Sequence, residues 1–298
     1  PDATVLVAAS LREVVDHLQQ RACLAKPDLD AAAEVSSGPD MASVHGQFEA
    51  RRALEISAAG GHHLLLSGPP GVGKTLLANC LPGLLPPLSE VDAADVAALA
   101  SLGARGYSLP AWGRRPFRAP HHSASSVALV GGGRQAQPGE VSLAHLGVLF
   151  LDELPEFDRR VLEVLREPLE SGQIDISRAD YKVRLPARFQ LVAAMNPCPC
   201  GYLGDGSGRC RCSAEQVARY QGRVSGPLLE RVDIHVTMPK ETLRINPVDD
   251  VAESSFSIRD RVCEAQQQQR VRAGELNARL GLDALHAACE LHACDRAL

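Results

Sequence analysis

The sequence has few aromatic residues, no long apolar run and no apolar leader at its start. Aromatic residues make up 4% of the 298 positions, so we expect a core built mainly of Leu, Val, Ile and Ala. No run of about 18 or more apolar residues is present, which excludes a transmembrane helix. The opening residues also lack the charged-then-apolar pattern of a signal peptide. The nine cysteines are an odd set spread along a long chain, unlike those of a small secreted domain. We therefore expect a reducing, cytoplasmic location and no membrane partner.

Length and charge limit the architecture and the partners. A chain of 298 residues can form one large α/β domain with a smaller appendage. The formal net charge of -5 argues against a protein that is basic over its whole surface. It allows a local basic strip, because surface charges act locally once salt screens them. The sequence begins at Pro1 rather than at Met, so we expect a fragment of a longer protein.

Three short apolar runs predict buried strands, and polar residues follow each of them directly. The runs cover residues 62–67, 147–151 and 189–195. Buried strands with polar residues at their carboxyl ends indicate a parallel sheet that carries a site along one edge. Apolar residues at helical spacing predict helices over residues 10–20 and 47–59. The fold class is therefore α/β.

A glycine-rich segment follows the first of these strands. It fits the pattern G-x-x-x-x-G-K-[ST] at every fixed position, and it predicts an ATP site. Glycines let backbone N–H groups turn toward phosphates, and the next helix directs its positive end at them. The lysine neutralises the β- and γ-phosphates, and the threonine hydroxyl binds Mg²⁺. The segment consists of Gly68, Pro69, Pro70, Gly71, Val72, Gly73, Lys74 and Thr75.

Four further residues are candidates for the chemistry of ATP hydrolysis. Asp152 ends a buried strand and is suited to hold Mg²⁺, while Glu153 beside it can act as general base for the attacking water. Asn196 follows the third strand and can contact that water or the γ-phosphate, or it can simply form a turn before a proline. Arg231 can reach the nucleotide of a neighbouring subunit, and a surface ion pair is its alternative.

Two C-x-C pairs form a candidate metal site. Cys198, Cys200, Cys210 and Cys212 supply four thiolates that a glycine-rich loop can bring together, and four thiolates bind Zn²⁺ tetrahedrally. The C-x-C spacing is less usual for zinc than C-x-x-C. A reduced, metal-free loop is therefore the alternative.

Several long strings in the same order resemble the magnesium-chelatase-like AAA+ ATPases, in particular their ComM (YifB) group. They are SLREVVDHL, HGQFEARRALEISAAGGHHLLLSGPPGVGKT, RPFRAPHHSAS, GEVSLAHLGVLFLDELPEF, ISRADYKVRLPARFQLVAAMNPCPCGYLGD and SGPLLERVDIHV. The resemblance implies a P-loop AAA+ fold of the helix-2-insert clade. It also implies a ring, expected to be a homo-hexamer, and ATP-driven work on DNA such as branch migration.

The resemblance also implies roles for particular residues. Asn196 takes the sensor-1 position, and Arg231 matches the arginine finger. The helix-2 insert would cover residues 127–142, and a hairpin before the sensor strand would cover residues 174–189. The residues that fall where the family contacts the adenine region are His45, Gly46 and Gln47.

The same resemblance divides the chain into three parts. Residues 1–35 are expected to be the tail of an N-terminal domain and a linker, and residues 36–240 the AAA+ nucleotide-binding domain. Residues 241–298 are expected to begin a helical lid that is incomplete, with its sensor-2 arginine beyond the end of the chain. The expected cofactors are ATP and Mg²⁺, together with the candidate Zn²⁺.

The candidate DNA contacts lie at the tips of the hairpin and of the insert. Arg178 and Lys182 are candidates in the hairpin, and Arg134 is a candidate in the insert, because mobile basic tips can bind phosphates without reading sequence. Solvated tips with no ligand are the alternative. Two other functions remain open, the ATPase subunit of a magnesium chelatase and a protein-remodelling AAA+ chaperone. The strings PFRAPHH and NPCPCGYLGD favour the DNA motor.

Overall fold

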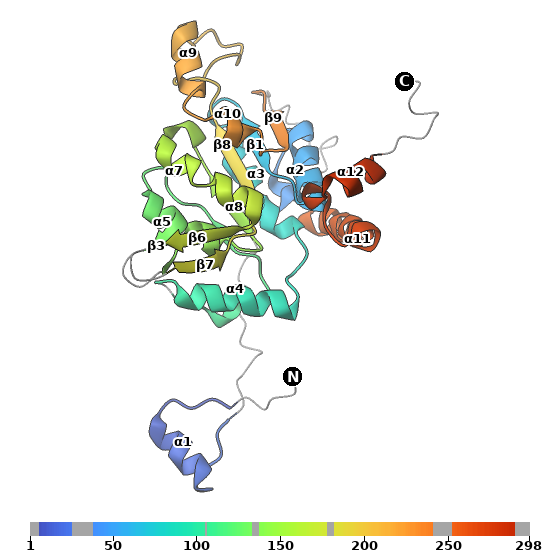
Figure 1. Ribbon diagram of the computed structural model, residues 1–298. Helices are drawn as coiled ribbons and strands as arrows, with labels where there is room; N and C mark the ends of the chain where they lie inside the picture. Colours follow the sequence, from blue (N-terminus) through green and yellow to red (C-terminus); the bar gives the residue numbers. More distant parts are fainter. Residues whose placement is uncertain are drawn as a thin grey trace. The chain divides into compact units, whose positions relative to one another are not determined.

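The computed structural model describes residues 6–25, 38–104, 106–132, 137–177, 182–240 and 252–289. The chain forms two compact units, whose elements are drawn in Figure 1. The smaller unit consists of Pro1–Ser36 and Ser108–Trp112, and the larger unit consists of Ser37–Tyr107 and Gly113–Leu298.

The smaller unit contains the first predicted helix. Helix α1 spans Leu11–Leu18, close to the predicted residues 10–20. The Ser10 hydroxyl accepts a hydrogen bond from the Glu13 N–H, as an N-cap residue does. An isolated bridge pairs Val7 with Ala25, and the 3-10 helix η2 (Leu109–Ala111) belongs to the same unit.

The larger unit is built on a parallel sheet, as the sequence predicts, and the sheet has five strands, the three predicted ones together with β2 and β9. Its strand order is β2-β5-β8-β1-β9, and every neighbouring pair is parallel. All five carboxyl ends therefore lie at one edge of the sheet. In this order the strands span Phe117–Arg118, Val148–Leu151, Gln190–Met195, Leu64–Ser67 and Ile234–Thr237.

The strands observed in the structure begin one or two residues later than the apolar runs that predicted them. Before β1, the His63 N–H donates to the Asp233 carboxylate at 2.8 Å, and the His63 ring accepts from the Leu191 N–H at 3.0 Å. Side-chain hydrogen bonds thus add to the backbone bond from Ile234 to the His63 oxygen at this end of the sheet. An apolar run cannot reveal these side-chain contacts.

Successive strand residues alternate between two hydrophobic cores. Leu64 and Leu66 belong to one core, and Leu65 belongs to the other. Side chains alternate across a strand, and both faces of this sheet are covered, so the strands read as continuous apolar runs.

Three helices cover one face of the sheet (Figure 1). They are α2 (Phe48–Gly60), α3 (Lys74–Leu84) and α11 (Ser255–Ala273), and α11 packs against the other two. The side-chain amides of Gln266 and Gln269 donate to the backbone oxygens of Ala58 and Ala59 at 2.8 and 3.0 Å. These two hydrogen bonds therefore join α11 to the last turn of α2.

The predicted hairpin and the predicted insert belong to the layer on the other face. The hairpin pairs β6 (Gln173–Ser177) with β7 (Lys182–Pro186), as expected for residues 174–189. The insert region forms helix α5, strands β3 and β4, and helix α6, at Ser126–Val130, Gly131–Gly132, Gln137–Pro138 and Glu140–Leu143.

The remaining elements are short helices and one longer helix, α4. The α-helices are α4 (Glu90–Leu102), α7 (Arg159–Glu163), α8 (Arg166–Ser171), α9 (Ala214–Gln221), α10 (Gly226–Leu229) and α12 (Leu282–Ala288). The 3-10 helices are η1 (Met41–Ser43), η3 (Leu154–Glu156) and η4 (Asn277–Arg279). Among the described residues, no helix combines the length and the apolar character needed to cross a membrane.

Candidate functional site

The strand order brings three predicted site segments to one edge of the sheet. Strand β8 lies between β1 and β5, so Asn196 follows a strand whose neighbours run into the phosphate loop on one side and into Asp152 on the other. The Gly68 N–H donates to the Met195 oxygen at 3.2 Å, which joins the start of the loop to the end of β8.

The phosphate loop has the backbone that its glycines permit. Gly71 and Gly73 adopt φ angles of +81° and +94°, in the left-handed region that favours glycine. At both positions, the space where a side chain would start has no heavy atom within 4 Å. Helix α3 begins at the next residue, Lys74, so its unpaired N–H groups face the loop.

Lys74 is buried among oxygen atoms. Its ammonium group donates to the Gly68 and Pro69 oxygens at 2.6 and 2.9 Å, and to the Asn196 side-chain oxygen at 3.1 Å. The residue is only 8% exposed. Burial lowers the pKa of Lys74, and the carboxylates of Asp152 and Glu153 oppose that shift. Two of the predicted site residues, Lys74 and Asn196, thus contact each other directly.

The two predicted magnesium ligands also contact each other. The Thr75 hydroxyl donates to a carboxylate oxygen of Asp152 at 2.8 Å. A hydroxyl and a carboxylate are oxygen donors, and oxygen donors suit Mg²⁺. The residues present therefore fit a magnesium ion bound beside the phosphates.

Glu153 has an unusual backbone and an unforeseen partner. Its φ angle is +53°, which is uncommon for a residue other than glycine, and residues in such conformations cluster at active sites. One Glu153 carboxylate oxygen lies 3.2 Å from Nδ1 of His122, and the His122 ring lies 4.0 Å from the ring of His121. The sequence offered only the His-His pair after a proline as a signal for this contact.

The predicted adenine-region residues lie next to the last strand of the sheet. The Gln47 amide donates to the Pro239 oxygen at 2.8 Å, just after β9. A side chain at Gly68 would start 2.5 Å from the Met238 oxygen, so the same segment closely approaches the phosphate loop. Gln47 adopts a φ angle of +51° immediately before α2. His45 is exposed and Gly46 is buried.

Arg231 forms an ion pair within its own chain. Its guanidinium donates to Glu170 at 2.6 Å and to the Pro227 oxygen at 2.6 Å. The sequence left open a surface ion pair and a finger that acts on a neighbouring subunit. The ion pair is present, and the finger role stays a prediction.

The four candidate zinc ligands lie together. Their sulfur atoms all lie within 4.8 Å of one another, and Cys198 is fully buried. Cysteines are metal ligands as thiolates, so the cluster has the donor set of a four-cysteine zinc site.

The basic residues considered for DNA have different environments. Arg178 and Arg134 lie outside the described residues. Lys182 is exposed at the start of β7, and its ammonium lies 3.9 Å from Asp175, which also accepts two hydrogen bonds from Arg184.

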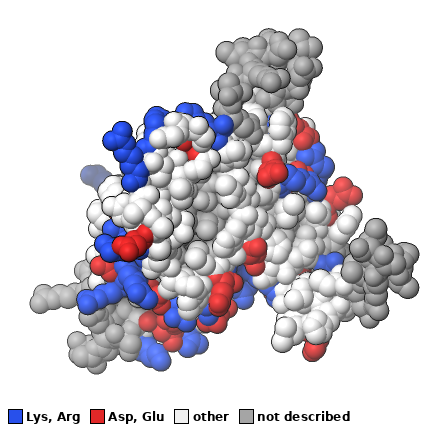
Figure 2. Space-filling model, turned by 90° about the horizontal axis from the view of Figure 1, so that it is seen from above, with Lys and Arg blue, Asp and Glu red and all other residues white. Residues whose placement is uncertain are grey.

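Two arginines upstream of the insert are structural. The Arg115 guanidinium is partly buried and donates to the Pro86 and Leu146 oxygens. Burial lowers the pKa of Arg115 to about 10. The Arg118 guanidinium forms a bidentate salt bridge with the Glu140 carboxylate. On the face in Figure 2, Lys and Arg lie among Asp and Glu along the rim, so attraction to DNA would be local.

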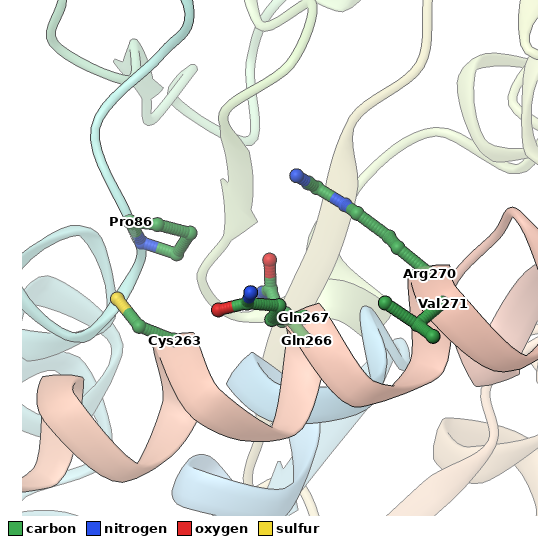
Figure 3. A pocket seen from close by; sticks show the side chains of 6 residues that line it. All are labelled: Pro86, Cys263, Gln266, Gln267, Arg270 and Val271. Atoms are coloured by element: carbon green, nitrogen blue, oxygen red, sulfur yellow. The ribbon is translucent and has the colours of Figure 1, made fainter.

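A cavity of about 410 Å³ opens beside helix α11 (Figure 3). None of its lining residues belongs to the phosphate loop or to the strand ends that carry Asp152 and Asn196. This cavity is therefore separate from the candidate ATP site, which lies at the sheet edge where Lys74 contacts Asn196 and Thr75 contacts Asp152. The cavity is lined by Pro86, Cys263, Gln266, Gln267, Arg270 and Val271.

Comparisons with known proteins agree on a family. A family model described as "Magnesium chelatase, subunit ChlI" matches residues 40–245. The chain is 48% identical to the YifB protein of Escherichia coli, over 97% of this chain and 57% of that protein. It is 46% identical to the competence protein ComM of Haemophilus influenzae, over 98% of this chain and 58% of that protein.

Similarity to a named chelatase subunit is lower. The magnesium-chelatase subunit ChlI of Cyanophora paradoxa is 28% identical over 48% of this chain and 36% of that subunit. The chain spans a little over half the length of its YifB and ComM relatives. With its matched family model, its phosphate loop and its parallel sheet, the chain belongs to the magnesium-chelatase (ChlI) family of P-loop AAA+ ATPases.

Proposed function

We propose that the chain is the ATP-hydrolysing module of a ring-forming motor that works on DNA. The observation that best supports ATP hydrolysis is the hydrogen bond from Thr75 to Asp152, which lies beside the buried Lys74. This arrangement supplies a cation and two oxygen ligands at the start of a helix. The DNA partner is supported by the similarity to ComM, a competence protein, and by the hairpin that carries Lys182.

The residues at the sheet edge would divide the work of hydrolysis among them. Lys74 and the loop amides would bind the β- and γ-phosphates, and Thr75 and Asp152 would hold Mg²⁺, which neutralises phosphate charge when bound. Glu153 would accept the proton of the attacking water. The Asn196 amide, now bonded to Lys74, would orient that water or contact the γ-phosphate.

The DNA partner is tested with the full-length protein. We expect single- or double-stranded DNA to stimulate ATP turnover, and we expect Arg178→Ala with Lys182→Ala to abolish the stimulation while basal turnover survives. On double-stranded DNA, each lost phosphate contact lowers the slope of log affinity against log salt by about 0.9. Two lost contacts should therefore flatten the slope by about 1.8.

A matched control removes two positive charges elsewhere. Arg159→Ala with Arg160→Ala takes them from the exposed start of α7 and should leave the salt slope and the DNA stimulation at parental values. Unchanged DNA affinity and slope in the hairpin variant would contradict the hairpin as the DNA contact.

A metal-chelatase subunit is the second candidate function. The observation that favours it is the family model, which is described by the ChlI subunit. The lower identity to the Cyanophora paradoxa subunit weighs against it. The same turnover assay separates the two functions. A full-length protein that hydrolyses ATP at a rate unaffected by any DNA would favour the chelatase function.

The ring is proposed as a homo-hexamer in which Arg231 acts on the nucleotide of the neighbouring subunit. We expect chains with Arg231→Ala and chains with Lys74→Ala to be inactive separately and partly active when mixed. In a mixed ring, an intact phosphate site can face an intact Arg231. ATP turnover as a function of mixing ratio measures the recovery. If mixed rings form and no ratio restores turnover, Arg231 does not act between subunits.

We also propose Zn²⁺ as the ion held by Cys198, Cys200, Cys210 and Cys212. The proposal is supported by four sulfur atoms gathered in one loop. An ion there would order a segment that has few apolar side chains. The expected content is about one zinc per chain.

A further inference from the structure

The loop that carries Cys198, Cys200, Cys210 and Cys212, called the cysteine loop below, lies directly against the phosphate loop. Gly201, between two of the cysteines, adopts a φ angle of +83°. A side chain at this position would start 2.8 Å from Cδ of Pro70 and 3.8 Å from Cγ of Asn196. Pro70 is a phosphate-loop residue, and Asn196 accepts a hydrogen bond from Lys74. The loop backbone thus approaches two parts of the ATP site at once.

Both ends of the cysteine loop are anchored. At its start, the Gln221 amide donates to the Pro197 oxygen at 3.0 Å. At its end, Ser213 caps α9 and exchanges hydrogen bonds with Gln216. Its middle is held by polar contacts, such as Asp205 with Ser207, and Leu203 is exposed. Apolar burial therefore contributes little to holding this middle part in place.

The sulfur atoms have the spacing of a tetrahedral thiolate site. A Zn–S bond of about 2.3 Å in tetrahedral geometry separates neighbouring sulfurs by roughly 3.8 Å. The Cys198 sulfur lies 3.3 Å from that of Cys200 and 3.8 Å from that of Cys210, and the last two are 3.6 Å apart. The cluster thus needs only small shifts to accept the ion.

We propose that a metal ion bound by the four cysteines acts as a positioning element for ATP hydrolysis. By closing the loop, the ion holds Gly201 against Pro70 and Asn196, and so fixes the phosphate loop and the residue proposed to orient the attacking water. This inference rests on the proposed ATPase function and on the proposed zinc ion. It adds that turnover depends on the ion although the ion touches neither nucleotide nor water.

The test compares a variant that loses two of the metal ligands with a variant that disturbs the contact between Gly201 and Pro70. In the full-length protein, Cys210→Ser with Cys212→Ser should reduce zinc from about one per chain to near zero. It should also lower kcat by about tenfold or more, comparable to the loss of a residue that supports the ligands of a metal site. ATP affinity should change much less, because Lys74 and the loop amides remain.

Gly201→Ala leaves all four sulfurs in place and forces its new methyl group toward Pro70. It should keep about one zinc per chain and still lower kcat. A matched control, Cys263→Ser with Cys289→Ser, removes two thiols outside the cluster and should change neither zinc content nor kcat. If the ligand variant does not fold, a parental kcat in Gly201→Ala still contradicts the positioning role of the loop.

Cobalt offers a signal that does not depend on turnover. Co²⁺ bound in place of zinc should show the strong visible absorption of a tetrahedral thiolate site, and the Cys210→Ser, Cys212→Ser variant should lack it. A parent protein that holds no metal and takes up no cobalt would overturn the zinc proposal. If the parent protein binds zinc, and both the zinc-free ligand variant and Gly201→Ala keep the parental kcat, only the positioning role is overturned.

Discussion

Replacing Lys74 with Ala is expected to abolish nucleotide binding at working concentrations. The Lys74 ammonium is buried and contacts three oxygen atoms at the start of α3, so it is positioned to face phosphate. Hydrogen bonds to charged groups contribute about 1.5–3 kcal/mol each, and about 1.4 kcal/mol is a factor of ten. The loss of two such bonds should weaken ATP binding by at least about 100-fold, which calorimetric titration measures.

The matched control for this experiment is Lys182→Ala. It removes the same side chain from the exposed hairpin and should leave ATP affinity at the parental value. Thermal melting of the Lys74→Ala chain checks that the fold survives. If a folded Lys74→Ala chain binds ATP as tightly as the parent, the phosphate loop is not the nucleotide site.

Glu153→Gln is expected to separate binding from hydrolysis. Glutamine keeps the shape of the side chain and can still accept a hydrogen bond from His122, but it cannot accept a proton from water. ATP affinity should stay at the parental value, while turnover should fall by about 10²–10⁴-fold, the usual contribution of a general base. Steady-state phosphate release and equilibrium titration measure the two quantities.

The control for the glutamate is Glu156→Gln in the same segment. Glu156 pairs with Arg223 at 2.9 Å, and both side chains are substantially exposed. An exposed pair of this kind contributes about 0–1 kcal/mol. Turnover close to the parental rate is expected in Glu156→Gln. If Glu153→Gln also hydrolyses ATP at that rate, the base lies elsewhere.

The sequence predicted the sheet and the phosphate loop because their patterns are local. A buried strand, a glycine-rich turn and a helix follow one another within residues 62–84. Likewise, the run 189–195 leads directly into Asn196. The proposed roles of Glu153, Asn196 and Arg231 in hydrolysis stay predictions.

Contacts between distant segments could not be predicted in the same way. His122 lies beside Glu153 because β2 pairs with β5, and strand pairing leaves no mark in a single sequence. The Arg115 guanidinium donates to two backbone oxygens, and no local pattern in the sequence marks it for that role. Whether an arginine is exposed depends on how helices and loops pack over it.

The alternation of strand residues between two cores has a consequence for thermal unfolding. Leu65 and Leu66 lie in different cores on the same strand, so the same sheet forms one wall of both cores. We expect the two layers to melt together as one cooperative transition. A nucleotide held at the strand ends then stabilises both layers together, by about 2.7 kcal/mol at a ligand concentration of 100 times Kd. Occupancy of the ATP site and heat resistance of the larger unit would therefore rise and fall together.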